Sequence, residues 1–445
     1  MQSTKTPSRW VPVSASAMGT VIEWYDFFLY SSAAVLVFNK QFFGDVSPTV
    51  GTIIAFATYA IGFVVRPLGG LVLGNLGDRV GRKPILLATV TMMGVSTILI
   101  GLLPTFDVIG YWAPALLILL RVVQGFGAGA EYGGAVVVAG ESGTVRRGFF
   151  TSIPAAGVDI AMMLATGMFA LFALLPEQDF DAWGWRIPFL LSIVGLVVAV
   201  FIRLRMDETE DFKQIEGTAR KSELSPMHRL MKYHRGKFFI AAGVNFGGSL
   251  TYIFQTFALA YAINNLGYPK VASLVGIMLS GLIGAIATVF WGYLSDRVGR
   301  RPVIIGGALF LIVFVVPFFL LLQLGSIWLL YLAVIVAHIA DRAIFGVQAS
   351  FYAEYFPTSV RFSGIAAARE LTSAFVGGPL PLIATAMVAA SGGSPWAVAS
   401  LVAVLAGVSA FSTWKAPETN AAISGYDADR DDTSAASAQP ADARL

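Results

Sequence analysis

The stretch GNLGDRVGRKP at residues 74–84 recurs as GYLSDRVGRRP at residues 292–302, so the chain carries one polar motif twice, 218 positions apart. The two copies share glycines, an aspartate and an arginine: Gly74, Asp78, Gly81 and Arg82 in the first, and Gly292, Asp296, Gly299 and Arg300 in the second. Each copy lies between two long apolar segments. Such a repeat indicates a duplicated chain, in which two equivalent sets of helices follow one another.

The apolar segments around each motif are typical of a membrane protein. Of 445 residues, 56% are hydrophobic and 13% are charged, against about 25% charged in soluble domains. The chain has no cysteine, which excludes disulfides and thiolate-bound metals. Windows of about 19 residues predict twelve transmembrane helices. They are expected at 14–38, 49–74, 84–104, 110–140, 148–174, 185–204, 236–264, 270–294, 302–323, 326–355, 360–390 and 395–414.

The positions of lysine and arginine predict the orientation of these helices. If both termini lie on one side, that side carries 23 of the 30 basic residues, and the other side carries Lys40, Arg186 and Lys270. An excess of basic residues marks the cytoplasmic side of a membrane. We therefore expect a multi-pass protein with both termini in the cytoplasm.

The predicted organisation has four parts. Residues 1–205 form an N-terminal six-helix half, 206–235 a polar, basic cytoplasmic linker, and 236–414 a C-terminal six-helix half. Residues 415–445 are poor in large apolar side chains and locally acidic, so a disordered cytoplasmic tail is expected there.

The duplicated motif resembles the loop signature G-x-x-x-D-R-x-G-R-K/R of the major facilitator superfamily. The resemblance implies an all-α membrane protein with twelve transmembrane helices in two six-helix halves. The aspartate of such a loop can stabilise a helix N-terminus, and its arginines can bridge to carboxylates at neighbouring helix ends. A basic loop that binds anionic lipid is the alternative. Residues expected to gate the molecule are Arg66, Asp78, Arg82, Glu141, Asp296, Arg300 and Glu354.

A narrower resemblance is to the metabolite:proton symporters of that superfamily, which include shikimate, α-ketoglutarate and proline/betaine permeases. It rests on EWYDFFLY at 23–30, FVVRPLGG at 63–70, RVVQGFGAGAEYGG at 121–134, WGWRIPF at 183–189, DETEDF at 207–212, AEYFPTSVRFSG at 353–364 and PET at 417–419. The resemblance implies a bacterial inner-membrane symporter, driven by a proton gradient without another cofactor or a metal.

Ionisable side chains inside the membrane are the candidate functional residues, because each costs roughly 2.5–3.5 kcal/mol to insert. Glu23, Asp26 and Tyr30 share one helical face. Two neighbouring carboxylates in a low-dielectric site cannot both be ionised at low cost, which favours a role in carrying protons. An ion pair with Arg66 or Arg121 that only joins helices is the alternative.

Two other helices carry polar residues that the apolar pattern does not explain. Arg121 and Gln124 match an R-x-x-Q-G element, and the resemblance links the arginine to proton transfer. Gly125, Gly129 and Gly133 follow at four-residue steps, which favours close helix packing. The tenth predicted helix carries the polar stripe His338, Asp341, Arg342, Phe345 and Gln348. It predicts either a carboxylate-binding, titratable site or a His–Asp–Arg network satisfied within the bundle.

These observations predict roles for named residues. Proton coupling is expected at Glu23, Asp26, Arg121, His338 and Asp341. Substrate contact is expected at Tyr25, Tyr30, Gln124, Asn245, Gln255, Arg342, Gln348 and Arg369.

The expected activity is proton-coupled import of a small organic acid, a shikimate-like mono- or dicarboxylate, by alternating access. A symporter of a zwitterionic osmolyte such as proline or betaine, and an uncoupled facilitator, remain open alternatives. An enzyme is disfavoured, since the chain lacks G-x-S-x-G and H-E-x-x-H motifs. The expected partners are the lipid bilayer, a small molecule and protons; no nucleic acid is expected, and the protein is expected to be a monomer.

Overall fold

The computed structural model describes residues 10–80, 82–129, 146–205 and 226–430, and within these ranges it contains helices and turns but no strand. Ten helical stretches of this part of the chain are long and apolar enough to cross a membrane, and Trp112–Ala128 is a shorter apolar helix. The seventh predicted span, at 236–264, is built from several short helical segments. The expected all-helical membrane fold is thus confirmed.

The first set of helices runs from the N-terminal region to residue 205. Its elements are α1 (Trp10–Ala33), η1 (Ala34–Phe38), α2 (Asn39–Gln41), α3 (Pro48–Val64), α4 (Arg66–Val80), α5 (Arg82–Leu102), α6 (Phe106–Ile109), α7 (Trp112–Ala128), α9 (Arg147–Phe172), α10 (Glu177–Asp179), η2 (Phe180–Gly184), α11 (Arg186–Leu190) and α12 (Ser192–Arg205). The η elements are single π-helical turns that continue their neighbours.

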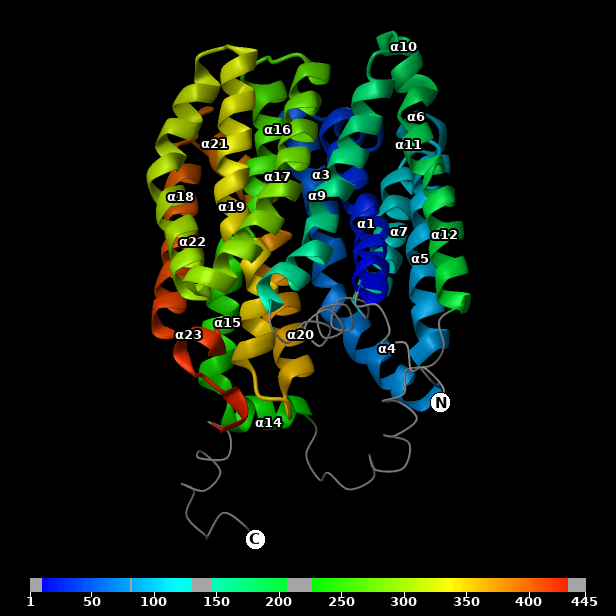
Figure 1. The fold of residues 1–445 in the computed structure, drawn as a ribbon. Helices are drawn as coiled ribbons and strands as arrows, with labels where there is room; N and C mark the ends of the chain where they lie inside the picture. Colours follow the sequence, from blue (N-terminus) through cyan, green and yellow to red (C-terminus); the bar gives the residue numbers. More distant parts are fainter. Residues whose placement is uncertain (1–9, 81, 130–145, 206–225, 431–445) are drawn as a thin grey trace.

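The second set follows from residue 226. Its elements are α14 (Pro226–Tyr233), α15 (Arg235–Gly248), η4 (Ile253–Phe257), α16 (Ala258–Ala260), η5 (Tyr261–Asn265), α17 (Lys270–Val298), α18 (Arg300–Gln323), α19 (Ile327–Tyr355), α20 (Arg361–Thr372), η6 (Ser373–Gly377), α21 (Leu380–Ala390), α22 (Trp396–Lys415) and α23 (Ala421–Ser424). Figure 1 shows the two sets side by side, with α9 next to α17 where they meet; α14 and α23 lie at the lower end, and α6 and α10 at the upper end.

The seventh span is interrupted between α15 and η4. Gly247, Gly248 and Ser249 end α15, and the Ser249 hydroxyl donates a hydrogen bond to the carbonyl oxygen of Asn245 at 2.9 Å. A helix break at this depth is tolerated where protein surrounds the backbone, as it does here, because residues 247–262 are buried. The break places polar side chains of η4 in the centre of the bundle.

Glycines bring α7 very close to α3 and α4. A Cβ atom on Gly125 would collide with the carbonyl oxygen of Gly62, and one on Gly129 with the carbonyl oxygen of Arg66. The predicted close packing is confirmed at these two positions, while Gly133 lies outside the described residues. This contact seats the side chain of Arg121 directly against the backbone of α3.

The two sets of helices touch at both ends of the molecule. At the lower end, Gly292 of α17 crosses so close to α9 that an added Cβ would lie 2.5 Å from Ser152 Cβ. At the upper end, Asn264 Nδ2 donates to Thr52 Oγ1 at 3.3 Å and Lys270 Nζ donates to Glu177 Oε1 at 2.8 Å. The two sets are therefore in contact at both ends.

Part of the segment for which disorder is expected is packed in the structure. Residues 416–430 run across the lower ends of the second set, where both Glu418 oxygens accept from the backbone N–H groups of Arg300 and Arg301, at 2.8 and 3.0 Å. Asp429 accepts from the backbone N–H and hydroxyl of Thr358. Composition alone could not show these contacts, because they are made with helix ends distant in sequence.

Candidate functional site

A first cluster of buried charges lies on α1 and α4. Glu23 and Asp26 are 7% and 5% exposed, and Arg66 Nη2 lies 3.8 Å from Glu23 Oε1. The guanidinium carbon of Arg66 is 4.0 Å from the ring centre of Phe27 and 5.4 Å from that of Trp24. Cation–π contacts of this kind offset part of the cost of burying a guanidinium, by about 2 kcal/mol when it is desolvated.

Arg121 of α7 completes this cluster. Its Nη1 donates to Gln124 Oε1 at 2.5 Å, and Gln124 Nε2 donates to Thr97 Oγ1 at 2.8 Å, so the predicted Arg–Gln element forms a hydrogen-bonded unit. The guanidinium carbon lies 4.3 Å from the ring centre of Tyr30, and Asp26 interacts with it electrostatically. Neutral groups and rings thus hold Arg121, with the acid Asp26 nearby.

A second cluster joins the two sets of helices through Asp159 of α9. Asp159 Oδ1 lies 2.8 Å from His338 Nε2 and accepts from Arg342 Nη1 at 3.1 Å, while Oδ2 accepts from Thr288 Oγ1 at 2.7 Å. The three partners belong to α17 and α19, and Asp159 is 1% exposed. A fully buried carboxylate of one set is therefore satisfied entirely by the other set.

The arginine of the polar stripe on α19 finds its partners within the protein, whereas His338 Nδ1 and Asp341 Oδ1 make no hydrogen bond with the described residues. Arg342 donates to Asp341 through Nε and Nη2, to Asp159 through Nη1 and to Thr251 Oγ1 through Nη2 at 2.6 Å. Its guanidinium carbon also lies 4.4 Å from the ring centre of Phe345. All three nitrogens of Arg342 have protein partners, which favours the His–Asp–Arg network over a free carboxylate-binding group.

Amides from α15, η4 and α19 form a third, uncharged group. Gln348 Nε2 donates to Asn245 Oδ1 at 2.7 Å and to Tyr352 Oη at 2.5 Å, and Asn245 Nδ2 donates to the carbonyl oxygen of Arg369 at 3.4 Å. Gln255 Oε1 accepts from Ser280 Oγ at 3.1 Å. Asn245 and Gln348 are thus brought together in the second set, while Gln255 is joined to α17.

Arg369 and Glu370 of α20 lie against the first cluster. The guanidinium carbon of Arg369 is 5.7 Å from the ring centre of Trp24, and Arg369 interacts electrostatically with Glu370, Glu23 and Arg66. Both residues are buried. The second set thus adds one positive and one negative charge to the acids and arginines of α1 and α4.

One predicted substrate residue lies apart from these clusters. The hydroxyl of Tyr25 donates to the carbonyl oxygen of Pro188 at 3.3 Å, so Tyr25 packs α1 against α11 within the first set. It follows Trp24 in sequence, but neighbours on a helix point about 100° apart.

The predicted gate residues of the second motif copy form a network at the lower end. Asp296 accepts from the backbone N–H groups of Gly148 and Phe149, both at 2.9 Å, and so caps the N-terminus of α9 in the other set. Arg300 Nη2 lies 2.8 Å from Asp296 Oδ1 and 3.0 Å from Glu354 Oε1. Glu141 and the side chains of Asp78 and Arg82, predicted to gate in the first copy, lie outside the described part of the chain.

Asp296→Ala is expected to open the lower end of the bundle. The change removes both acceptors at the N-terminus of α9 and one partner of Arg300. Since the chain has no cysteine, Ser152→Cys provides a single reporter at the crossing of α9 and α17. Alkylation of this cysteine should become about tenfold faster, which corresponds to ~1.4 kcal/mol.

Glu418→Ala is the matched control for that experiment. It removes a carboxylate that caps backbone N–H groups of α18, but both partners belong to the second set. Equal acceleration in the two variants would contradict a specific link between the sets through Asp296.

Two residues of the site have no assigned role in the sequence interpretation. Asp159 is an isolated acid in a mainly apolar helix, and the sequence gives no other indication of its role. Glu370 has no local signal beyond its place next to Arg369 in the sequence. The partners of both come from helices distant in sequence, so no local pattern identifies them.

The comparisons with known proteins agree with one another. A sequence model described as "Major Facilitator Superfamily" matches residues 16–381. The shikimate transporter of Escherichia coli (strain K12) is 40% identical over 380 residues, covering 84% of this chain and 86% of that protein. The proline/betaine transporter of the same organism is 34% identical over 394 residues, covering 85% and 78%. A crystal structure of a D-xylose-proton symporter aligns with a TM-score of 0.71 at 19% identity, covering 92% and 98%.

Proposed function

Because the chain belongs to the major facilitator superfamily, we propose that it is a proton-coupled symporter that imports a small organic acid by alternating access. The protein is a multi-pass membrane transporter, not an enzyme. What is proposed is the coupling ion, the substrate class and the roles of individual residues.

The observation that carries the proposal is the contact of Asp159 with His338 and Arg342 across the two sets of helices. Rocking the two sets apart must separate Asp159 from these partners. An ionised carboxylate that is buried without a partner is unfavourable in free energy, so the separation favours protonation of Asp159. Proton transfer between His338 and Asp159 would therefore be linked to the opening of the transporter. Asp341 and His338, two of the residues expected to couple protons, lie in this network. Glu23, Asp26 and Arg121 form the other candidate site for a proton.

The balance of buried charges also supports coupling to protons. Among the described residues, the first two clusters together with Arg369 and Glu370 contain the acids Glu23, Asp26, Asp159, Asp341 and Glu370 and the bases Arg66, Arg121, Arg342 and Arg369. These five acids and four arginines have a net charge of zero only when one extra proton is bound, on His338 or on a carboxyl group. A carboxylate substrate would add a negative charge, so its entry without a further proton would leave uncompensated charge in a low-dielectric site.

The relatives support a substrate that carries a carboxylate. Two relatives of the chain are a shikimate transporter and a proline/betaine transporter. The proposed contacts are Arg369, Tyr30 and Gln124 at the centre and Asn245, Gln255 and Gln348 on the second set, with Arg342 acting through the Asp159 network.

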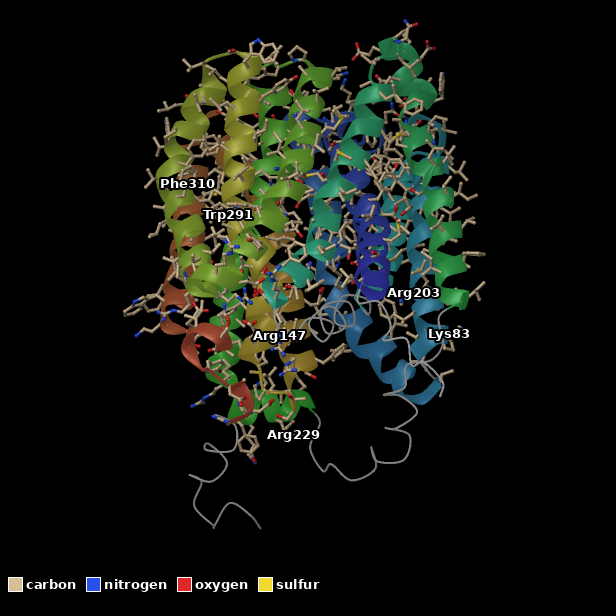
Figure 2. All side chains as sticks on the ribbon, viewed as in Figure 1. Lys83, Arg147, Arg203, Arg229, Trp291 and Phe310 are labelled. Carbon is tan, nitrogen blue, oxygen red and sulfur yellow. The ribbon has the colours of Figure 1, made fainter. Side chains whose placement is uncertain are left out.

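We also propose that the lower end of the molecule faces the cytoplasm. Lys83, Arg147, Arg203 and Arg229 all lie in the lower part of the view in Figure 2. An excess of basic residues on one side favours that side for the cytoplasm. The network of Asp296, Arg300 and Glu354 would then be the inner gate.

The test is uptake of labelled shikimate by proteoliposomes that contain the purified protein. With an acidic outside and a neutral inside, we expect accumulation above equilibration, and a protonophore should abolish it. Equal rates with and without the pH gradient would overturn symport. Proline and glycine betaine are tested in parallel, and accumulation of these alone would favour an osmolyte transporter.

A further inference from the structure

The region between Trp24, Arg66 and Glu370 contains buried polar atoms that the protein leaves without hydrogen bonds. Glu370 is 6% exposed, yet neither of its carboxylate oxygens accepts a hydrogen bond from the described residues. Within the same part of the chain, the indole Nε1 of Trp24 and the Nε and Nη2 atoms of Arg66 donate none, although Nη2 lies near Glu23. More than nine in ten buried polar groups are satisfied in proteins, and each exception costs about 1–3 kcal/mol.

These atoms lie around one place where the two sets of helices meet. Trp24 is close to both Arg66 and Arg369, with 5.4 and 5.7 Å from its ring centre to the two guanidinium carbons. Tyr252 interacts electrostatically with both Arg66 and Glu370, and its ring centre lies 5.3 Å from that of Phe63. Donors from α1 and α4 and an acceptor from α20 therefore lie in the same part of the interface between the two sets, next to aromatic rings.

Arg66 differs in its partners from Arg342, another buried arginine of the bundle. All three nitrogens of Arg342 donate to protein acceptors. At Arg66, by contrast, aromatic rings cover the guanidinium and its nearest carboxylate oxygen is 3.8 Å away. A guanidinium held mainly by ring faces keeps N–H groups available for an added anion.

We propose that Trp24, Arg66 and Glu370 form a ligand subsite for a small carboxylate that also carries an O–H or N–H donor. The ligand carboxylate accepts from Arg66 and Trp24, with the positive charge of Arg369 beside it, and the ligand donor binds the carboxylate of Glu370. This inference rests on the proposed transport function and narrows its substrate class. Hydroxy acids and secondary or primary amino acids fit, whereas a betaine has no hydrogen to donate to Glu370.

The test compares two ligands that differ only in hydroxyl groups, shikimate and cyclohex-1-ene-1-carboxylate. Binding to the purified full-length protein is measured by calorimetry. We expect the wild type to bind shikimate at least tenfold more tightly. Glu370→Ala should remove this preference, because it removes the acceptor, while binding of the unhydroxylated acid changes less than about threefold. Trp24→Phe, which removes one N–H group and keeps a ring, should weaken both ligands by a similar factor.

The outcomes separate this subsite from the proposed function. If Glu370→Ala keeps the preference for shikimate, or if the wild type binds neither acid, the subsite is overturned. If the preference depends on Glu370 but uptake ignores the pH gradient, the subsite stands and symport fails. If Glu370→Ala does not fold, Glu370→Gln and Trp24→Phe are used for the test. The proposal is overturned if both variants keep the wild-type preference for shikimate and the wild-type affinity for the two acids.

Discussion

Asp159→Asn is expected to make uptake independent of the pH gradient. Asparagine keeps the size of the side chain and can still accept a hydrogen bond from Thr288, but it removes one of the two carboxylates that surround Arg342. The network is then neutral without a proton on His338, so the transport cycle no longer requires one there. Accumulation driven by an acidic outside should fall at least about tenfold, while exchange of labelled for unlabelled substrate continues.

The measurement is paired uptake and exchange in the same proteoliposomes. Thr288→Val is the matched control, since it removes the hydrogen bond to Asp159 Oδ2 and leaves every charge in place. It should retain accumulation driven by the pH gradient. Wild-type accumulation in Asp159→Asn would contradict a role of Asp159 in coupling and leave Glu23, Asp26 and Arg121 as the proton-binding cluster.

Arg342→Ala is expected to destabilise the whole protein. Asp159 and Asp341 are 1% and 0% exposed. Without Arg342, His338 is the one residue among their described contacts that can still carry a positive charge. Removing one partner of a buried ion pair typically costs about 3–5 kcal/mol. We expect a marked fall in the yield of monodisperse protein and in its melting temperature in detergent.

A charge-neutral double variant distinguishes this explanation from loss of a ligand contact. Asp341→Asn combined with Arg342→Gln removes one negative and one positive charge, and Asp159 keeps His338 and Thr288. Most of the lost stability should return. If Arg342→Ala instead melts like the wild type but no longer binds shikimate, the substrate role predicted from the sequence is the better account.

The central clusters show which contacts can be predicted from spacing within a single helix. The spacing of Arg121 and Gln124 places both on one face of a helix, and their hydrogen bond is the direct consequence. Helical spacing also places His338 and Asp341 near Arg342. It does not supply Asp159, because that partner comes from a helix about 180 residues away and no periodic signal links the two.

Tyr25 shows that a residue within a functional motif need not point into the site. It lies between Trp24 and Asp26 in a stretch whose residues carry the site, yet its hydroxyl contacts α11. A residue's membership of a motif does not fix the direction of its side chain, since helical geometry sends neighbours to different faces.

The membrane fold, the duplicated motif and the identity of the ionisable groups inside the bilayer follow from the chain itself. They depend on composition and on spacing within single helices, because apolar length and helical period are local properties. Which buried acid meets which arginine, and which polar atoms stay available to a ligand, was decided by the packing of helices distant in sequence. Buried charges are tolerated only in pairs or networks, and those partners exist only once the two sets of helices have come together.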